Sequence, residues 1–170
     1  MTIFALSTAN GIAGLAVIRV SGHLALTALK TLSRKSHFEP NVMTRTNFYD
    51  PNTSELIDKG LAVFFARPNS FTGEDVVEIH IHGGISTVNL ALKALGSIDQ
   101  LKLAEPGEFS KRSFINNKMD LTAIEAMGDL INAQTEAQHS QALSHMGGSL
   151  NQLYMSWRKT LIELVAYLEA

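Results

Sequence analysis

The distribution of proline divides the chain into two parts that must fold differently. All four prolines lie in the first 118 residues, which also hold most of the runs of β-branched residues. Residues 119–170 contain no proline, and their apolar residues recur every three or four positions, the spacing of one helix face. We therefore predict an α+β domain over residues 1–118 and the first part of a helical domain over residues 119–170. The boundary is expected near residues 116–118, where polar residues break the pattern.

Short apolar runs between turn-forming residues predict a mixed sheet in the first part. The expected strands are residues 3–7, 15–20, 47–49, 56–66, 76–82 and 101–104. Helices are expected at 23–33 and 86–95, with a third that has Pro106 in its first turn and ends near residue 115. Residues 47–49 and 56–66 flank a turn-rich stretch and predict an antiparallel pair. Strands and helices do not alternate strictly, so the fold class is α+β.

The second part carries one long apolar stripe: Leu143, Met146, Leu150, Leu153, Trp157, Leu161, Leu164 and Leu168. This spacing predicts helix packed on other helices, with Trp157 in a core and a kink or break at Gly147-Gly148. We expect His139 and His145 at a surface or interface. Because the stripe continues to the end of the chain, we expect a helical domain that is incomplete here.

Composition excludes several classes of protein. There is no cysteine, which excludes disulfides, thiolate metal sites and a cysteine nucleophile. The net charge of −2 gives no basic excess typical of nucleic-acid binders. No apolar run approaches the ~20 residues of a membrane span, and no signal peptide or nucleotide-binding P-loop is present. We expect a soluble protein of a reducing compartment, with no membrane partner and no nucleotide hydrolysis by this chain alone.

Residues 71–84, FTGEDVVEIHIHGG, form the strongest candidate site. Alternation along a strand places Glu78, His80 and His82 on one face, just before Gly83-Gly84 and a helix. Such a face suits a ligand, but it also suits an ordinary solvated sheet surface. His80 and His82 alone are too few for a catalytic zinc site, so no metal is expected.

Other candidates have both ligand-binding and structural interpretations. Arg19 interrupts an apolar strand, so it must meet a ligand or form an ion pair with a glutamate. Lys118, at the junction of two folding units, is either a ligand contact or a solvated lysine. Gly11 and Gly14 favour a tight turn over a ligand cradle. A surface helix accounts for two further cations, Lys111 and Arg112.

Four blocks of sequence resemble the TrmE/MnmE family of tRNA-modification GTPases. Residues 71–84 match the family signature FTGED followed by Glu and HGG, and the other blocks are residues 17–22, 104–112 and 116–126. The blocks occur in the family's order and cover essentially the whole chain. The loop of residues 9–14 departs from the family because it lacks the usual arginine.

The resemblance implies an N-terminal domain similar to the folate-binding part of the glycine-cleavage T protein. That domain would bind a 5-formyl-tetrahydrofolate-type one-carbon donor and form a homodimer. In the full-length family protein, a GTPase domain that uses GTP, magnesium and potassium is inserted into the helical domain. With the flavoprotein MnmG (GidA), the family modifies C5 of the wobble uridine of certain tRNAs, in the cytoplasm of bacteria. The GTPase domain and the cysteine-bearing tail are absent here, so we expect an N-terminal piece.

The resemblance also assigns roles to individual residues. The family's folate contacts fall on Arg19, Glu78 and Lys118, while Gly83 and Gly84 would allow close approach of a ligand to the backbone. Glu78 can accept paired hydrogen bonds from a pterin, and the two cations can hold the formyl oxygen or the glutamate tail. Two other functions stay open: a stand-alone folate-dependent one-carbon transferase using His80 or His82 as acid–base, and a ligand-free dimerisation scaffold.

Overall fold

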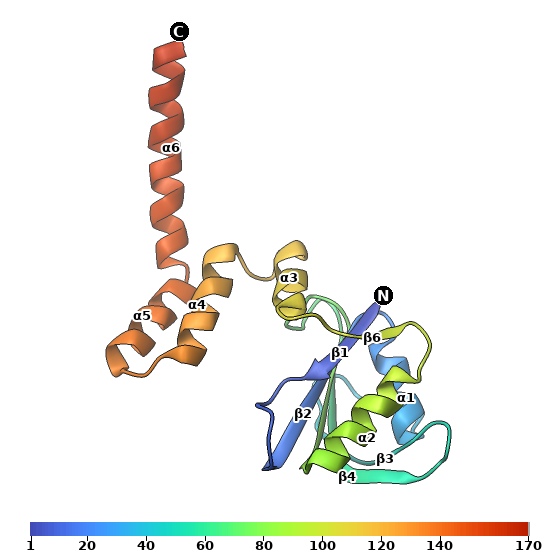
Figure 1. The fold of residues 1–170 in the computed structure, drawn as a ribbon. Helices are drawn as coiled ribbons and strands as arrows, with labels where there is room; N and C mark the ends of the chain where they lie inside the picture. Colours follow the sequence, from blue (N-terminus) through green and yellow to red (C-terminus); the bar gives the residue numbers. More distant parts are fainter. Residues whose placement is uncertain (170) are drawn as a thin grey trace. The chain divides into compact units, whose positions relative to one another are not determined.

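The computed structural model describes residues 1–169, which fall into two units. The first unit is Met1–Ser113 and the second begins at Phe114. Strands gather in the first unit and helices alone make up the second, as the colours along the ribbon show (Figure 1). The predicted α+β class is confirmed by this mixture of one sheet and six helices.

The first unit is built on a six-stranded mixed sheet with strand order β3-β4-β5-β2-β1-β6. Only β1 and β6 pair in parallel, and every other neighbouring pair is antiparallel. The predicted antiparallel pair across the turn at residues 50–53 is confirmed as β3 and β4. The strands are β1 (Thr2–Leu6), β2 (Ala13–Ser21), β3 (Thr44–Tyr49), β4 (Leu56–Phe65), β5 (Val76–Gly83) and β6 (Leu101–Leu103).

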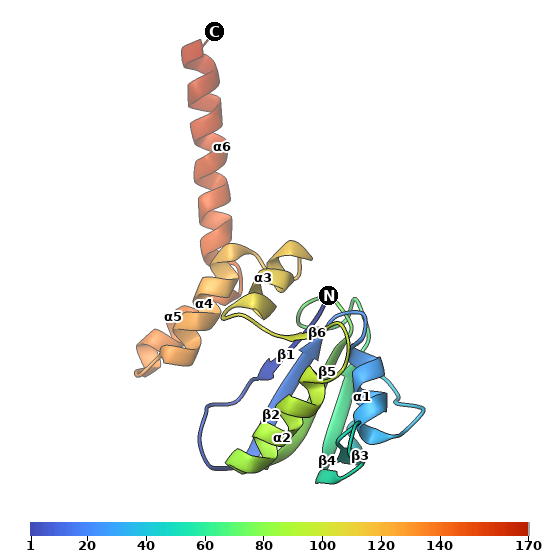
Figure 2. The ribbon, with the colours of Figure 1, turned by 45° about the vertical axis from the view of Figure 1, so that its right-hand side comes forward.

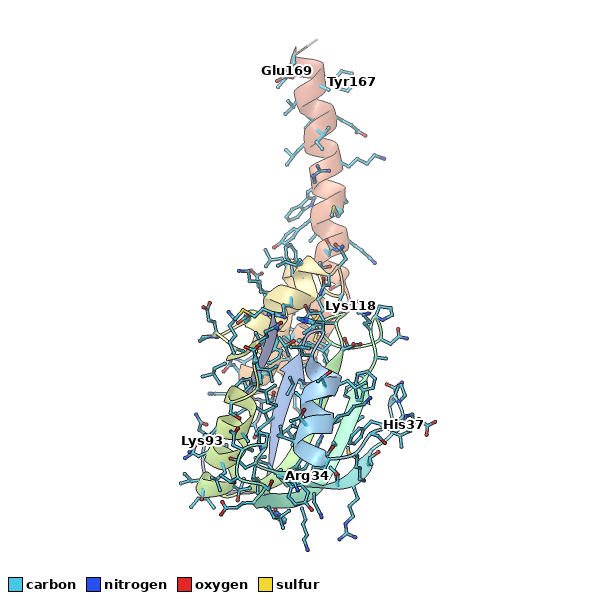
Figure 3. All side chains as sticks on the ribbon, turned by 90° about the vertical axis from the view of Figure 1, so that its right-hand side faces the viewer. Arg34, His37, Lys93, Lys118, Tyr167 and Glu169 are labelled. Carbon is cyan, nitrogen blue, oxygen red and sulfur yellow. The ribbon has the colours of Figure 1, made fainter. Side chains whose placement is uncertain are left out.

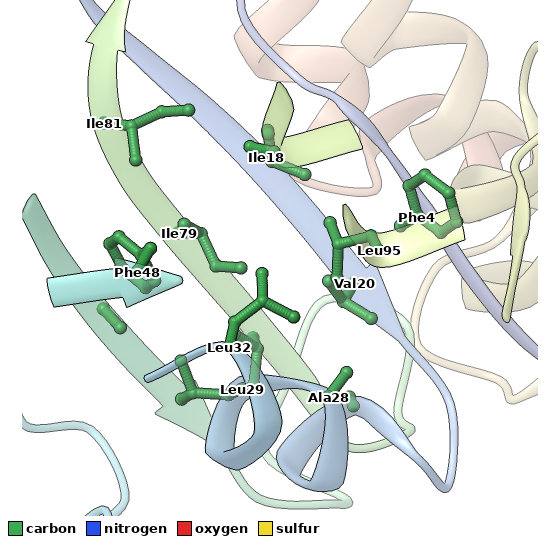
Figure 4. Close-up of a cluster of buried hydrophobic side chains, with 14 of the residues drawn as sticks. Phe4, Ile18, Val20, Ala28, Leu29, Leu32, Phe48, Ile79, Ile81 and Leu95 are labelled. Carbon is green, nitrogen blue, oxygen red and sulfur yellow. The ribbon is translucent and has the colours of Figure 1, made fainter. Parts of the chain in front are cut away.

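Two helices, α1 (Ala25–Ser33) and α2 (Ile85–Gly96), cover one face of this sheet (Figure 2). The core lies between them and the strands. Figure 4 shows Leu29 and Leu32 of α1 facing Ile79 and Val20 of the sheet. Alternation therefore places the residues between these strand positions on the second face of the sheet, which α1 and α2 leave uncovered. The second face of β2 and β5 carries the predicted site.

The helix α3 (Glu108–Ile115) begins later than predicted. Pro106 lies before it instead of in its first turn. The physical reason is Gly107, whose φ of +75° is left-handed and cannot belong to a right-handed helix. The Glu108 carboxylate accepts a hydrogen bond from the Glu105 backbone nitrogen at 3.0 Å, which fixes this turn ahead of the helix.

The second unit contains α4 (Leu121–Asn132), α5 (Glu136–Met146) and α6 (Ser149–Glu169). Asp120 caps α4, and Thr135 with Gln138 forms a capping box at the start of α5. The predicted break at Gly147-Gly148 is confirmed, since it separates α5 from α6. None of the helices among residues 1–169 combines the length and apolarity needed to cross a membrane.

The prediction that Trp157 lies in a core is wrong for the residues that the structure describes. Its side chain is 54% exposed, and α6 contributes no buried residue. A helix of this length is about 30 Å long, and it packs on α5 only near its start. Most of the apolar stripe of α6 is therefore exposed. The two histidines of α5 are predicted at a surface or interface, and the structure agrees, with His139 exposed and His145 half-buried.

Candidate functional site

Arg19 and Glu78 form the centre of the candidate site. They are direct cross-strand partners on β2 and β5. Arg19 donates from Nε at 3.1 Å and from Nη2 at 2.7 Å, and both hydrogen bonds end on Oε1 of Glu78. The side chains are only 25% and 20% exposed. The predicted alternative in which Arg19 pairs with a glutamate is thus confirmed, and a ligand contact on the same pair stays a prediction.

Two aromatic rings complete the surroundings of the Arg19 guanidinium. Its Cζ lies 5.1 Å from the ring centre of Phe71 and 5.8 Å from that of Phe109. Both distances are within the range of a cation–π contact. Phe71 belongs to the FTGED loop and Phe109 to α3, so two segments outside the sheet close one end of the site. No pattern in the sequence indicates that Phe109 lies beside Arg19.

His80 follows Glu78 on the same face of β5. Its Nε2 lies 3.7 Å from Oε2 of Glu78, the oxygen that Arg19 does not use. Within residues 1–169, this Nε2 is buried and has no hydrogen-bond partner. Leu61 and Val17 are the cross-strand neighbours of His80. With apolar side chains on both neighbouring strands and the Glu78 oxygen beyond hydrogen-bond distance, the imidazole nitrogen is unsatisfied, which is unusual for a buried polar atom.

His82 lies on the same face but is bound to Asp58 instead. The His82 backbone nitrogen donates to Oδ2 of Asp58 at 2.8 Å, and its Nδ1 lies 2.9 Å from Oδ1. Burial raises the pKa of the Asp58 carboxyl, but the hydrogen bonds from His82 and Lys59 outweigh it and hold that pKa below its usual value. Among residues 1–169, no three histidine or acidic side chains gather where they could hold a metal ion.

A shallow pocket adjoins His80 on this face. Its volume is about 180 Å³, and its lining comes from β2, β4 and β5 on the side of His80 away from Glu78. The lining residues are Gly14, Leu15, Lys59, Gly60, Leu61, His80, Ile81 and His82. The site therefore has its aromatic end at Phe71 and an open end beyond His80.

Gly83 and Gly84 differ in what they accommodate. A Cβ on Gly83 would lie 2.6 Å from the carbonyl oxygen of Ala13, its partner on β2. The missing side chain of Gly83 is therefore required by strand pairing. A Cβ on Gly84 would meet only Thr87 Oγ1, at an ordinary 3.5 Å. Gly84 precedes α2 with extended backbone, so only there is space left beside the backbone.

Arg112 lies on α3, the helix predicted to account for it, but its side chain forms two ion pairs that the sequence pattern does not predict. Its side chain is 15% exposed and donates to Glu74 at 2.9 Å and to Glu108 at 3.0 Å. Burial by itself lowers the pKa of the Arg112 guanidinium, but the two carboxylates outweigh burial and raise that pKa. The pair with Glu74 could not be predicted from the helix, because Glu74 comes from another loop, whereas Glu108 lies on α3 itself, four residues before Arg112. Lys111, its neighbour, is exposed as predicted.

Glu74 connects this ion pair to the end of β2. Ser21 donates to Oε2 of Glu74 at 2.8 Å, and Ser21 Oγ lies 2.7 Å from Thr72 Oγ1. The Ser113 hydroxyl donates to the Phe71 carbonyl oxygen at 2.9 Å. These contacts fasten the FTGED loop and the start of α3 to the sheet. The one sequence feature that points to these contacts is Ser21, a polar residue at the end of β2 that shares a strand face with Arg19.

Lys118 belongs to the second unit, in the exposed segment between α3 and α4 (Figure 3). Its role in ligand binding stays a prediction. Gly11 lies in the loop before β2, with φ of +138° and open space around it. Its conformation fits a turn that only glycine adopts readily.

Comparison with known proteins agrees with the sequence blocks. The family model described as GTP-binding protein TrmE N-terminus matches residues 2–118, and the model described as MnmE helical domain matches residues 121–170. The chain belongs to the TrmE/MnmE family. The resemblance stated from residues 71–84 and the three other blocks is thereby confirmed.

Relatives in distant organisms cover almost the whole chain. A tRNA modification GTPase MnmE of Parvibaculum lavamentivorans is 52% identical over 169 residues, which are 99% of this chain and 39% of the relative. An MnmE of Rickettsia bellii is 51% identical, over 99% of this chain and 38% of its own length. The mitochondrial tRNA modification GTPase gtpbp3 of Dictyostelium discoideum is 46% identical, over 99% and 34%. The chain thus spans less than two fifths of these relatives.

Proposed function

We propose that the first 118 residues bind a reduced folate of the 5-formyl-tetrahydrofolate type, through Arg19 and Glu78. The observation that carries the proposal is their half-buried ion pair on the second face of the sheet, in which Glu78 keeps one oxygen available for a ligand. A pterin presents neighbouring N–H donors, and a carboxylate is an acceptor that can meet two of them. The Arg19 guanidinium supplies donors for an oxygen of the ligand.

The proposed folate site also includes Lys118, Gly83 and Gly84, and the support for these three residues differs. Lys118 offers a charge-assisted donor for the glutamate tail or the formyl oxygen. Gly84 leaves space beside the backbone, whereas Gly83 is already needed for strand pairing. Similarity to the folate-binding part of the glycine-cleavage T protein is part of this proposal.

Membership of the family supports the wider role. We propose that this domain forms a homodimer, and that residues 119–170 begin the helical domain of a cytoplasmic GTPase that modifies C5 of the tRNA wobble uridine with the flavoprotein MnmG. GTP, magnesium and potassium would belong to the full-length protein only. Its tRNA would be bound through the full complex.

Calorimetric titration of 5-formyl-tetrahydrofolate into the 170-residue chain tests the folate site. We expect binding with Kd on the order of micromolar and a loss of about tenfold or more in Glu78→Ala, since a hydrogen bond to a charged group contributes roughly 1.5–3 kcal/mol. Glu39→Ala removes an exposed carboxylate elsewhere in the first unit and serves as the control. Absence of binding by folded, dimeric protein would overturn the folate proposal and favour the scaffold.

A further inference from the structure

The buried Nε2 of His80 lacks a hydrogen bond, and none of the described residues provides one. Nε2 is buried without a hydrogen bond, although the His80 side chain as a whole is 16% exposed. A buried polar atom left unpaired costs free energy, so such atoms normally have a partner in the functional state. Ile79 and Ile81 point into the core (Figure 4), so the His80 ring between them lies on the ligand face.

The position of this nitrogen relative to Glu78 defines a pattern of hydrogen-bonding groups. Along the face stand Arg19, then Oε1 of Glu78, then Oε2, then Nε2 of His80 at 3.7 Å from Oε2. Oε2 is an acceptor, and a neutral imidazole with its hydrogen on Nε2 is a donor. An acceptor next to a donor fits a flat ligand edge on which an N–H group adjoins a carbonyl oxygen.

A 2-amino-4-oxopteridine ring has such an edge. Its amino group and ring N3–H are donors, and its 4-oxo group beside N3 is an acceptor. If N3–H donates to Oε2 of Glu78, the 4-oxo group lies next to the position of Nε2. Two hydrogen bonds that start from adjacent ligand atoms and spread slightly apart reach protein atoms at about the observed separation.

We infer that His80 recognises the 4-oxo group of the bound folate through a hydrogen bond and so contributes to specificity for 4-oxo over 4-amino pteridines. The inference rests on the proposed folate site, and it adds a residue that the family resemblance does not assign. His80 donates from Nε2 to the 4-oxo oxygen, while Glu78 holds the neighbouring N3–H. A 4-amino group would bring a second donor against the same nitrogen, and its ring N3 would carry no hydrogen to donate to Glu78, so both residues favour the 4-oxo ring.

The apolar neighbours of His80 make this recognition selective. Leu61 and Val17 flank it across the sheet and offer no alternative hydrogen bond. A site whose buried donor is left unpaired by the wrong ligand discriminates more strongly than a site that only fills space. His82, by contrast, is bound to Asp58 and is 72% exposed, so it carries no comparable constraint.

The test compares two ligands on four proteins by calorimetry: wild type, His80→Leu, His80→Gln and His37→Leu. The ligands are 5-formyl-tetrahydrofolate and the same molecule with an amino group in place of the 4-oxo group. We expect His80→Leu to weaken binding of the 4-oxo ligand by about tenfold or more and to reduce the preference for it, leaving only the part that Glu78 contributes. His80→Gln keeps an N–H donor and should restore most of the preference, and His37→Leu, at an exposed histidine, should change neither.

Each other result has a distinct meaning. If wild type binds the 4-oxo ligand and His80→Leu binds both ligands with unchanged preference, the inference is overturned while the folate site stands. An equal loss for both ligands in His80→Leu, with no recovery in His80→Gln, assigns His80 a packing role and also overturns it. Wild type that binds neither ligand overturns both this inference and the proposed function.

Discussion

Arg112 and Glu74, 38 residues apart in sequence, form a hydrogen-bonded ion pair in which Nη1 lies 2.9 Å from Oε2. The same carboxylate oxygen accepts from Ser21 at the end of β2. The pair therefore fastens α3, which carries Phe109, to the loop that carries Phe71. Both rings contact the Arg19 guanidinium, so this ion pair positions the aromatic end of the candidate site.

Replacing Arg112 should destabilise the first unit. Arg112→Ala removes the cation from the 30%-exposed Glu74 carboxylate and leaves the 14%-exposed Glu108 carboxylate with Lys102 alone, at 3.7 Å. We expect a loss of roughly 1–3 kcal/mol, between the values typical of exposed and of buried ion pairs. Urea unfolding followed by circular dichroism measures it. Lys111→Ala, on the exposed neighbour, is the matched control, and equal stability of the two variants would show that the pair contributes nothing.

The two glycines after β5 should respond differently to an added methyl group. Gly83→Ala forces a Cβ to within 2.6 Å of the Ala13 carbonyl oxygen, so β2 and β5 must separate there. We expect a loss of about 1–3 kcal/mol from overpacking, measured by urea unfolding. Gly84→Ala should be close to neutral in stability, because its Cβ meets an ordinary contact.

Because Gly84→Ala should leave stability unchanged, this variant tests separately whether Gly84 contributes to folate binding. Its effect on 5-formyl-tetrahydrofolate affinity is measured in a protein that folds normally. A clear loss of affinity would place the ligand against this backbone. Unchanged affinity together with unchanged stability would remove Gly84 from the proposed site.

Local pattern was sufficient to predict most of the first unit. Alternation along residues 76–82 predicts both the core face and the face shared by Glu78, His80 and His82, and the structure confirms it. The antiparallel pairing of β3 and β4 was also predictable, because a turn joins them directly. Both features depend only on residues close together in sequence, because strand alternation and a short turn determine their geometry.

Contacts between distant segments were not predictable from the same patterns. The order of the strands brings Arg19 opposite Glu78 across 59 residues. The apolar strand around Arg19 requires this residue to meet a ligand or a glutamate, but the sequence pattern does not identify which glutamate. Phe109 and the Glu74 partner of Arg112 were missed for a related reason, since residues on a helix surface look solvated until another loop covers them. The unsatisfied Nε2 of His80 is likewise visible only when its neighbours are known.

The exposure of Trp157 gives a direct spectroscopic prediction. Trp157 is the chain's only tryptophan, and it contacts Tyr154 on the same helix, with ring centres 5.7 Å apart. At low protein concentration we expect emission and acrylamide quenching close to those of an exposed indole. A strongly blue-shifted, protected signal that persists on dilution would contradict the exposure. Leu161→Lys should suppress any blue shift that appears only at high concentration, because it places a charge on the same apolar stripe.

Asp120 should stabilise the start of α4 in a pH-dependent way. Its Oδ1 accepts from the Thr122 hydroxyl at 2.7 Å and from the Ala123 backbone nitrogen at 2.8 Å, and its Oδ2 accepts from Asn151 at 2.7 Å. The hydrogen bond from Thr122, followed by that from Ala123, lowers the pKa of the Asp120 carboxyl. Loss of such an N-cap costs about 1 kcal/mol, so Asp120→Ala should reduce amide-exchange protection in the first turn of α4 about fivefold at neutral pH.

The lowered pKa determines the direction of the pH effect. A carboxyl that is more acidic in the folded state contributes its full stabilisation above its ordinary pKa of about 3.9, and loses it as pH falls through the lower pKa of the folded state. Protection in wild type should therefore decline toward that of Asp120→Ala in strong acid. Glu125→Ala, which removes an exposed carboxylate from the same helix, should leave protection unchanged. A difference between wild type and Asp120→Ala that stays constant at every pH would show that the ionised carboxylate is not the cap.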